Sequence, residues 1–240
     1  MDILVCDHIE REGVRQRPGP VVRPWVCEAN EPPGQAYADF RALYNTWQHG
    51  GDDFVGFMGY RKYFLFPGFE WVYTEPSHVP TWRNASRSWF NQYRDALSKW
   101  DGASILPLLA THDIIVTPPF QLPKLPGESQ STLMDDFAAS RSSHDARVLA
   151  AALRARNVSP ASCQIYPYIF VTRWSVFNRF MEFAWPLAQE LEPLCKGADS
   201  VNPDYKRRPM AYVLERAFSL WLENSGLSRV ELPIVNCWEL

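Results

Sequence analysis

Residues 37–64 read YADFRALYNTWQHGGDDFVGFMGYRKYF, and this stretch decides the fold. Its first part places apolar residues at helical spacing, and Gly50-Gly51 ends the helix. Phe54–Met58 follows as a short apolar strand, after which comes a cationic aromatic cluster, Tyr60-Arg61-Lys62-Tyr63. The stretch therefore predicts an amphipathic helix, a double-glycine turn and a buried strand. We expect the cluster at the end of the strand to suit a ligand that carries phosphate.

Composition predicts a globular protein that does not bind nucleic acid. The chain has 240 residues, of which 46% are hydrophobic, and its net charge is -3. This length fits one domain over residues 1–240, and a weakly acidic chain has no overall attraction for nucleic acid or an anionic membrane. Any anion must then be held by a local cationic patch.

Cysteine use and hydropathy favour a cytoplasmic protein. The five cysteines are far apart and never form a Cys-x-x-Cys pair, which argues against a zinc knuckle or a disulfide framework. The amino terminus has too short an apolar run for a signal peptide, and no stretch approaches the roughly 20 apolar residues that span a bilayer. We expect a soluble protein, or at most a peripheral one.

The remaining pattern alternates strands with helices, which favours an α/β sheet with helices on both faces. A loop is expected over residues 10–24, and a second, over residues 118–131, has the Pro, Gly, Ser and Gln content of a lid or binding loop or of a simple surface excursion. Strands are predicted at residues 3–6, 113–116, 165–171 and 232–235, and helices at residues 89–97 (begun by Ser86 or Ser88), 133–156, 177–191 and 210–223.

Several common site motifs are absent from the sequence. It has no P-loop, Gly-x-Gly-x-x-Gly, Gly-x-Ser-x-Gly or His-Glu-x-x-His, which removes the commonest nucleotide hydrolases, dinucleotide enzymes, serine hydrolases and zinc proteases. The five histidines are scattered, and their spacing indicates no metal site.

The order of several blocks resembles a known family. Residues 39–49 and 54–64 are similar to the hallmark of the capsular and exopolysaccharide glycosyltransferases once catalogued as domain of unknown function 4422. That pattern has an acidic residue, Leu-Thr-Ala-Leu-Tyr-Trp-x-Trp-Lys-Asn, and then Tyr-Ile-Gly-Leu-x-His-Tyr-Arg-Arg-Tyr-Phe. Gly59 stands where the pattern has its histidine. Further blocks fit at Asp113-Ile-Ile, His144-Asp145, Ile165-Tyr-Pro-Tyr168, Trp185-Pro-Leu187 and Tyr212–Trp221, with Tyr205 and Arg208 between them.

The resemblance implies a glycosyltransferase A-like (Rossmann-like) mixed sheet flanked by helices on both faces. It also implies an enzyme of the hexosyltransferase class that moves a sugar from a nucleotide-sugar donor to an oligosaccharide or lipid-linked glycan acceptor of a bacterial surface polysaccharide. A lipid-linked acceptor would bring the protein to the inner face of the cytoplasmic membrane as a peripheral contact.

The same resemblance suggests how the donor is held. Related sheets hold a divalent ion on the donor diphosphate with an Asp-x-Asp pair, which this chain lacks at the end of its strand. Tyr60, Arg61 and Lys62 are expected to hold the diphosphate instead, with help from Arg208, because guanidinium and ammonium groups bind phosphate. We therefore predict no metal and no other cofactor. Arg61 and Lys62 as a solvated strand end, and residues 206–208 as a solvated loop, are the alternatives.

Four further residues complete the predicted site. Glu215 is the preferred general base, since it borders the apolar face of its helix beside Arg216, and Asp145 is the second candidate. Asp39 and Arg41 either face the nucleotide or serve as structural ions at the edge of the buried stripe. Surface roles for Glu215 and Asp145 remain open.

Two other functions fit the same sequence. One is a non-catalytic glycan-binding protein of the same fold, which the glycine in place of histidine and the missing Asp-x-Asp favour. The other is a metal-dependent hydrolase that uses His112, Asp113, His144 and Asp145, and it requires these groups to share one coordination sphere.

Overall fold

A computed structural model describes residues 1–7, 20–26, 39–51, 53–59, 61–72, 74–76, 82–121, 164–196 and 209–237. In chain order the elements are β1 (Asp2–Asp7), β2 (Val22–Val26), α1 (Phe40–His49), β3 (Phe54–Gly59), β4 (Lys62–Phe64), β5 (Glu75–Pro76), β6 (Trp82–Asn84), α2 (Arg87–Leu97), the 3-10 turn η2 (Ala103–Ile105), α3 (Leu106–Thr111), β7 (Ile114–Val116), β8 (Phe120–Gln121), β9 (Gln164–Ile165), β10 (Phe170–Arg173), α6 (Trp174–Lys196), α8 (Pro209–Asn224), β11 (Arg229–Glu231) and β12 (Ile234–Asn236).

The main sheet is mixed and branches at β3. One part runs in the order β2-β1-β3-β10-β7-β11, and the other continues from β3 through β4, β12, β6 and β5. Strand β10 is antiparallel to both of its neighbours, β3 and β7, whereas β1, β2 and β3 are parallel. This pairing confirms the predicted mixed α/β sheet.

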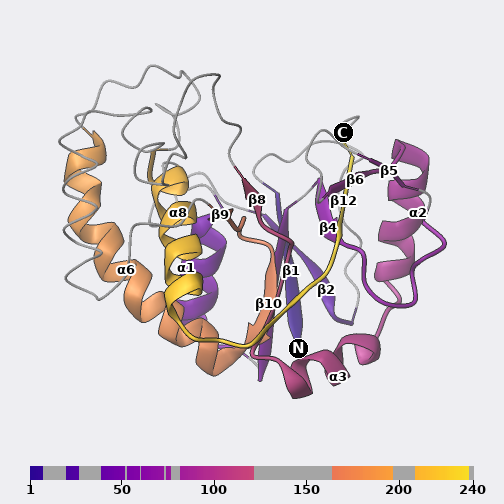
Figure 1. Cartoon of the computed structure of the whole chain (residues 1–240), viewed down its shortest axis with the longest axis horizontal. Coiled ribbons are helices and arrows are strands. Elements are labelled where there is room, and N and C mark those ends of the chain that lie inside the picture. The colour runs from indigo at the N-terminus through magenta and orange to yellow at the C-terminus, as the bar shows by residue number, and fades with distance from the viewer. Residues whose placement is uncertain are drawn as a thin grey trace.

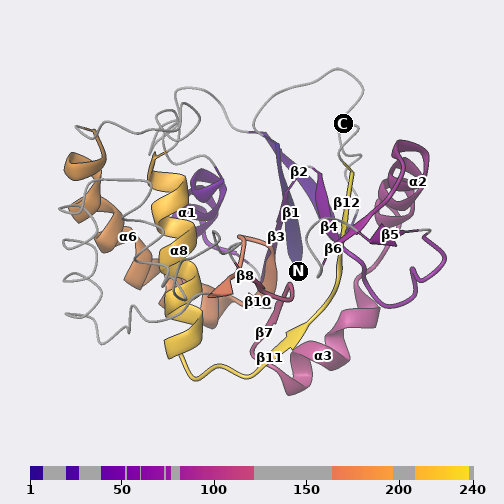
Figure 2. The ribbon, with the colours of Figure 1, turned by 45° about the horizontal axis from the view of Figure 1, so that its top comes forward.

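Both faces of the sheet are buried, and neighbouring residues of one strand serve different cores. Phe57 belongs to the core under α1, α6 and α8, while Met58 belongs to the core that includes α2. Val116 and Ile115 divide in the same way on β7. Figures 1 and 2 show α1, α6 and α8 together on one side of the sheet and α2 with α3 on the other. The predicted helices on both faces are thus confirmed.

The double-glycine turn has a separate reason for each glycine. Gly50 ends α1 with φ 73°, a left-handed value that favours glycine. Gly51 instead lies against the ring of Trp174, so that a Cβ there would come within 2.6 Å of the ring. The amide of Trp174 also donates to the carbonyl of Asp53 over 2.8 Å, which fixes the start of α6 beside this turn.

The predicted elements are largely present, with four corrections. The loop expected over residues 10–24 contains the start of β2, because Val22 pairs with Ile3. The strand expected at residues 165–171 is divided into β9 and β10 by the buried segment 166–169, where Pro167 has no amide hydrogen for a ladder. Likewise, Pro233 divides the last strand into β11 and β12. The strand β8 lies in the loop expected over residues 118–131.

Two further differences concern the rest of the chain. Ser86 rather than Ser88 begins α2, since its Oγ accepts a hydrogen bond from the amide of Trp89. The helix expected at residues 133–156 lies outside the described residues. No helix in the described part of the chain is both long and apolar enough to cross a membrane.

Candidate functional site

The sheet register brings several chain segments to one edge, which we call the carboxyl edge. It is the edge at which β1, β2 and β3 end, and Cys6 pairs there with Gly59. Because β4 turns back from β3 and pairs with β12, Lys62 lies opposite both Gly59 and Asn236. Helices α1 and α8 precede strands that run toward this edge, so Asp39 at the N-cap of α1 and Glu215 in the second turn of α8 lie near it.

Glu215 is a partly buried acid in an environment of mixed charge. Burial raises the pKa of its carboxyl, the cations Lys62 and Arg216 lower it, and Asp39 raises it again. Burial is the largest of these effects, so the pKa is raised on balance. A carboxylate with a raised pKa holds a proton more readily, which is a property of general bases. Lys62 and Asp39, from two other elements, thus both act electrostatically on Glu215.

Lys62 is held in place by an aromatic ring. Its Nζ lies 4.5 Å from the ring centroid of Trp82, close enough for a cation–π interaction. The turn that precedes it is fixed by the amide of Cys237, which donates to the carbonyl of Arg61 over 3.0 Å. The ammonium group is therefore positioned by β4, β6 and the end of β12.

Asn236, opposite Lys62, and Asn84, opposite Asn236, were not predicted as site residues. Asn236 pairs with Lys62 in the ladder and donates from its Nδ2 to Oδ1 of Asn84 over 3.2 Å. Asn236 is fully buried, and its Oδ1 has no hydrogen-bond partner in the described part of the chain. The only signal in the sequence is an amide side chain at the end of an apolar strand. Strand pairing is needed to show that this amide lies opposite Lys62.

Tyr168 is the other residue that the sequence did not indicate as functional. Its ring packs against Phe40, Phe218 and Phe180, with ring centroids 6.1, 5.5 and 6.3 Å away. Burial raises the pKa of its hydroxyl well above the ordinary value, and the negative charges of Glu215 and Asp39 raise it further. The hydroxyl is therefore neutral and keeps a hydrogen that it can donate, beside two acids.

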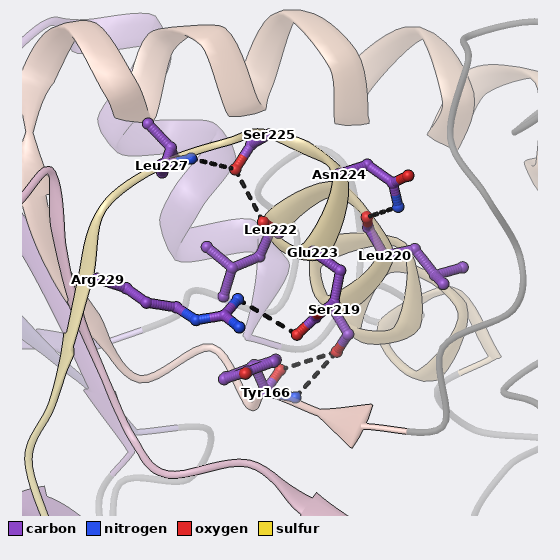
Figure 3. A network of polar contacts seen from close by, with 9 residues as sticks. All are labelled: Tyr166, Ser219, Leu220, Leu222, Glu223, Asn224, Ser225, Leu227 and Arg229. Carbon is purple, nitrogen blue, oxygen red and sulfur yellow. Dashed lines mark hydrogen bonds and ion pairs between the residues drawn. The ribbon is translucent and has the colours of Figure 1, made fainter.

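A polar network fixes α8 against the segment that carries Tyr168 (Figure 3). The Oγ of Ser219 accepts from the amide of Tyr166 over 2.9 Å. Its own hydroxyl hydrogen can go to the carbonyl of Glu215 at 3.0 Å or that of Tyr166 at 3.3 Å. Farther along α8, Glu223 forms a 3.2 Å ion pair with Arg229 of β11, whose guanidinium lies over the Tyr166 ring. The network sets the turn bearing Glu215 relative to Tyr168.

Of the six other predicted site residues, the structure describes three. Asp39 occupies the N-cap position of α1, yet its side chain makes no capping hydrogen bond there. Arg41 is buried, with 3% of its surface exposed, so it does not lie at the exposed border of the helix. Arg61 is partly buried in the turn before β4. The predicted residues Tyr60, Arg208 and Asp145 lie outside the described residues.

The residues of the hydrolase alternative do not lie at the carboxyl edge as far as they are described. Asp113 precedes β7 at the opposite edge, where its Oδ2 accepts from the amide and the hydroxyl of Ser228 over 2.8 and 2.7 Å. These bonds lower the pKa of the Asp113 carboxyl. His112 contacts Thr111 and the carbonyl of Leu108. Within the described ranges, no group of three His, Cys, Asp or Glu side chains could hold a metal ion.

Gly59 leaves room where the family pattern has histidine. A Cβ built there would meet only the Cβ of Lys62, at 3.9 Å, which is an ordinary contact. The backbone at Gly59 also lacks the positive φ that would require glycine. Nothing in the described backbone therefore obliges this position to be glycine.

Sheet order, flanking helices and the charged carboxyl edge define a glycosyltransferase A-like fold. The chain belongs to the family described as Domain of unknown function (DUF4422), whose model matches residues 33–226. Among solved structures, it is similar to the apo structure of WbbM, a bifunctional glycosyltransferase, with a TM-score of 0.72 and 16% sequence identity. The match covers 100% of this chain and 45% of that one, so the chain spans less than half of WbbM. No curated protein matches it.

Proposed function

We propose that this protein is a glycosyltransferase that moves a sugar from a nucleotide-sugar donor to a bacterial surface polysaccharide or its lipid-linked precursor. The observation that carries the proposal is the position of Lys62 at the carboxyl edge, opposite Gly59 and 4.5 Å from the Trp82 ring, where its charge lowers the pKa of the partly buried Glu215. A cation for the leaving group and a carboxylate for the incoming group are the two charges that sugar transfer needs. Membership of the family and the fold shared with a glycosyltransferase support it.

In the proposed step Glu215 takes the proton of an acceptor hydroxyl. The oxygen of that hydroxyl forms a bond to the anomeric carbon of the donor sugar, while the bond from this carbon to the diphosphate oxygen breaks. The nucleoside diphosphate leaves with the electron pair, and its added charge is balanced by Lys62, with Tyr60, Arg61 and Arg208 as further diphosphate ligands. Asp39 and Arg41 complete the donor site, and Asp145 is the alternative base.

The proposal includes transfer without a metal ion. Its support is the ammonium of Lys62, 4.5 Å from the Trp82 ring, at the start of β4 and just after the strand end where related folds carry metal-binding aspartates. A preorganised cation stabilises the developing charge without reorganisation during the reaction.

A thermal-shift screen tests the donor class and the metal together. UDP-glucose, UDP-galactose, GDP-mannose and dTDP-rhamnose, each beside its free nucleoside diphosphate, would be added to the protein with EDTA or with manganese. Since a ligand of the folded state raises the melting temperature, at least one nucleotide sugar should do so in EDTA. A shift that requires manganese would reject the metal-free step, and no shift with any nucleotide would reject the transferase.

The second candidate is a glycan-binding protein without catalysis, and Gly59 is the observation that favours it. It predicts that oligosaccharides stabilise the protein while nucleotides do not. Replacing Glu215 with glutamine would then leave glycan affinity unchanged, because binding needs no base.

A further inference from the structure

Tyr168 carries a polar group whose purpose the fold alone does not explain. Its side chain is 7% exposed, and its hydroxyl has no hydrogen-bond partner among the described residues. A buried hydroxyl without a partner costs free energy, whereas phenylalanine would fill the same space without that cost. The surrounding rings Phe40, Phe180 and Phe218 would accept phenylalanine equally well.

The acids near the Tyr168 hydroxyl indicate which part of a ligand it could contact. It lies close enough to Glu215 and Asp39 for both carboxylates to act on it. Glu215 is in turn within reach of the ammonium of Lys62. In the proposed reaction, the transferred sugar is bonded to the diphosphate at Lys62 and attacked on the side of Glu215. In that arrangement, a hydrogen-bond donor beside Glu215 faces the sugar rather than the nucleotide.

The ring is also held rigidly enough to select a substrate. Three aromatic neighbours fix its plane, and the bond between Ser219 and Tyr166 ties its segment to α8 at 2.9 Å. A donor in a fixed direction discriminates strongly between sugars that do and do not offer an oxygen there, because a mismatch leaves the buried group without a partner.

We infer that Tyr168 is a specificity-determining residue, whose hydroxyl donates a hydrogen bond to an oxygen of the transferred sugar. This inference rests on the proposed function and adds to it the recognition of the sugar itself. It concerns the donor sugar, and neither the nucleotide nor the acceptor.

The first test uses the stability of the ligand-free protein. Tyr168→Phe should have an unchanged or higher melting temperature, because it removes a polar group that lacks a partner. Tyr166→Phe is the matched control, since its hydroxyl is hydrogen-bonded to the side chain of Glu223 and its removal should lower the melting temperature. A clear fall for Tyr168→Phe would show that the hydroxyl has a structural partner and would overturn the inference.

The second test is calorimetric titration with the nucleotide sugar that gives the largest shift in the screen, and with its free nucleoside diphosphate. Tyr168→Phe should weaken the nucleotide sugar roughly fivefold to tenfold, the value of one hydrogen bond, and leave the nucleoside diphosphate within about twofold. Tyr166→Phe should change neither affinity.

The outcomes separate the two proposals. Equal affinities of wild type and Tyr168→Phe for the nucleotide sugar would overturn the role of Tyr168 and leave the transferase standing. An equal loss for both ligands, or a loss confined to the acceptor, would overturn it as well. A wild-type protein that binds no nucleotide sugar would reject both.

Discussion

The Nζ of Lys62 lies 4.5 Å from the centre of the Trp82 ring, and its charge lowers the pKa of Glu215 on α8. The aromatic ring holds the ammonium but leaves its charge in place. A carboxylate partner would instead neutralise that charge. The cation therefore remains available to an anionic ligand while its position is fixed.

Lys62→Met should weaken binding of the nucleoside diphosphate by at least about tenfold, the cost of losing one charge-assisted hydrogen bond. It should also shift the acidic limb of the activity profile to higher pH, because Lys62 lowers the pKa of Glu215. Calorimetry and pH–rate profiles measure these effects. Lys99→Met, at an exposed lysine just beyond α2, is the control. Equal effects of the two variants would contradict the role of Lys62.

Glu215→Gln should reduce sugar transfer by about 10²–10⁴-fold and leave donor affinity nearly unchanged, because a general base acts in the transition state. Coupled release of nucleoside diphosphate measures the rate. Glu190→Gln, at an exposed position of α6, should keep full activity. Retained transfer in Glu215→Gln would move the role of base to another acid.

The same variant should change how stability depends on pH. The pKa of Glu215 is higher in the folded protein than its ordinary value, so the folded state binds more protons between the two values. This contribution to stability is present below the unfolded pKa and is lost as pH rises through the folded pKa. Glu215→Gln should therefore gain melting temperature relative to wild type as the pH is raised from 4 to 8. A melting-temperature difference between the variant and wild type that does not change with pH would rule out a raised pKa of Glu215.

Ser219→Ala should destabilise the protein by about 1–3 kcal/mol, since the buried amide of Tyr166 loses its acceptor. It should also lower kcat while changing KM less, because the turn bearing Glu215 is no longer fixed to the segment of Tyr168. Urea unfolding and steady-state kinetics measure the two effects. Ser225→Ala removes a 2.8 Å bond to the carbonyl of Leu222 at the end of α8 and should cost less, with no kinetic effect. A kinetic loss shared by both variants would point to general loosening of α8.

Gly51→Ala should destabilise the protein by about 1–3 kcal/mol, because its Cβ would lie 2.6 Å from the Trp174 ring. Gly59→Ala should change stability by less than about 0.5 kcal/mol, since the nearest atom would be 3.9 Å away. Thermal unfolding of the two variants gives the comparison directly. The reverse ranking would show that Gly59, rather than Gly51, is constrained by packing.

The sequence predicted the fold well where periodicity is strong. The path from α1 through the glycines into β3 follows from spacing alone, because helix and strand place apolar residues at different intervals. The branch at β3 was not predictable in this way. Lys62–Phe64 is a short strand, and its identity depends on pairing with residues 234–236, far along the chain.

The candidate site was predictable in part for the same reason. Glu215 was indicated by its helical position, and its role as base and that of Lys62 as a diphosphate ligand stay predictions. Tyr168 and Asn236 were missed because each lies within apolar sequence and looks like core. Only the three-dimensional structure shows that a polar atom of each lacks a partner among the described residues.

The branch in the sheet gives the proposed site a mechanical property. Lys62 belongs to the part formed by β4, β12, β6 and β5, whereas Glu215 and Tyr168 belong to the part covered by α1, α6 and α8. A nucleotide sugar bound by Lys62 and by Glu215 and Tyr168 would connect these two parts of the sheet. Occupancy would then stiffen the molecule across the boundary between the two parts, which the chain crosses from β3 to β4, between β6 and β7, and from β11 to β12.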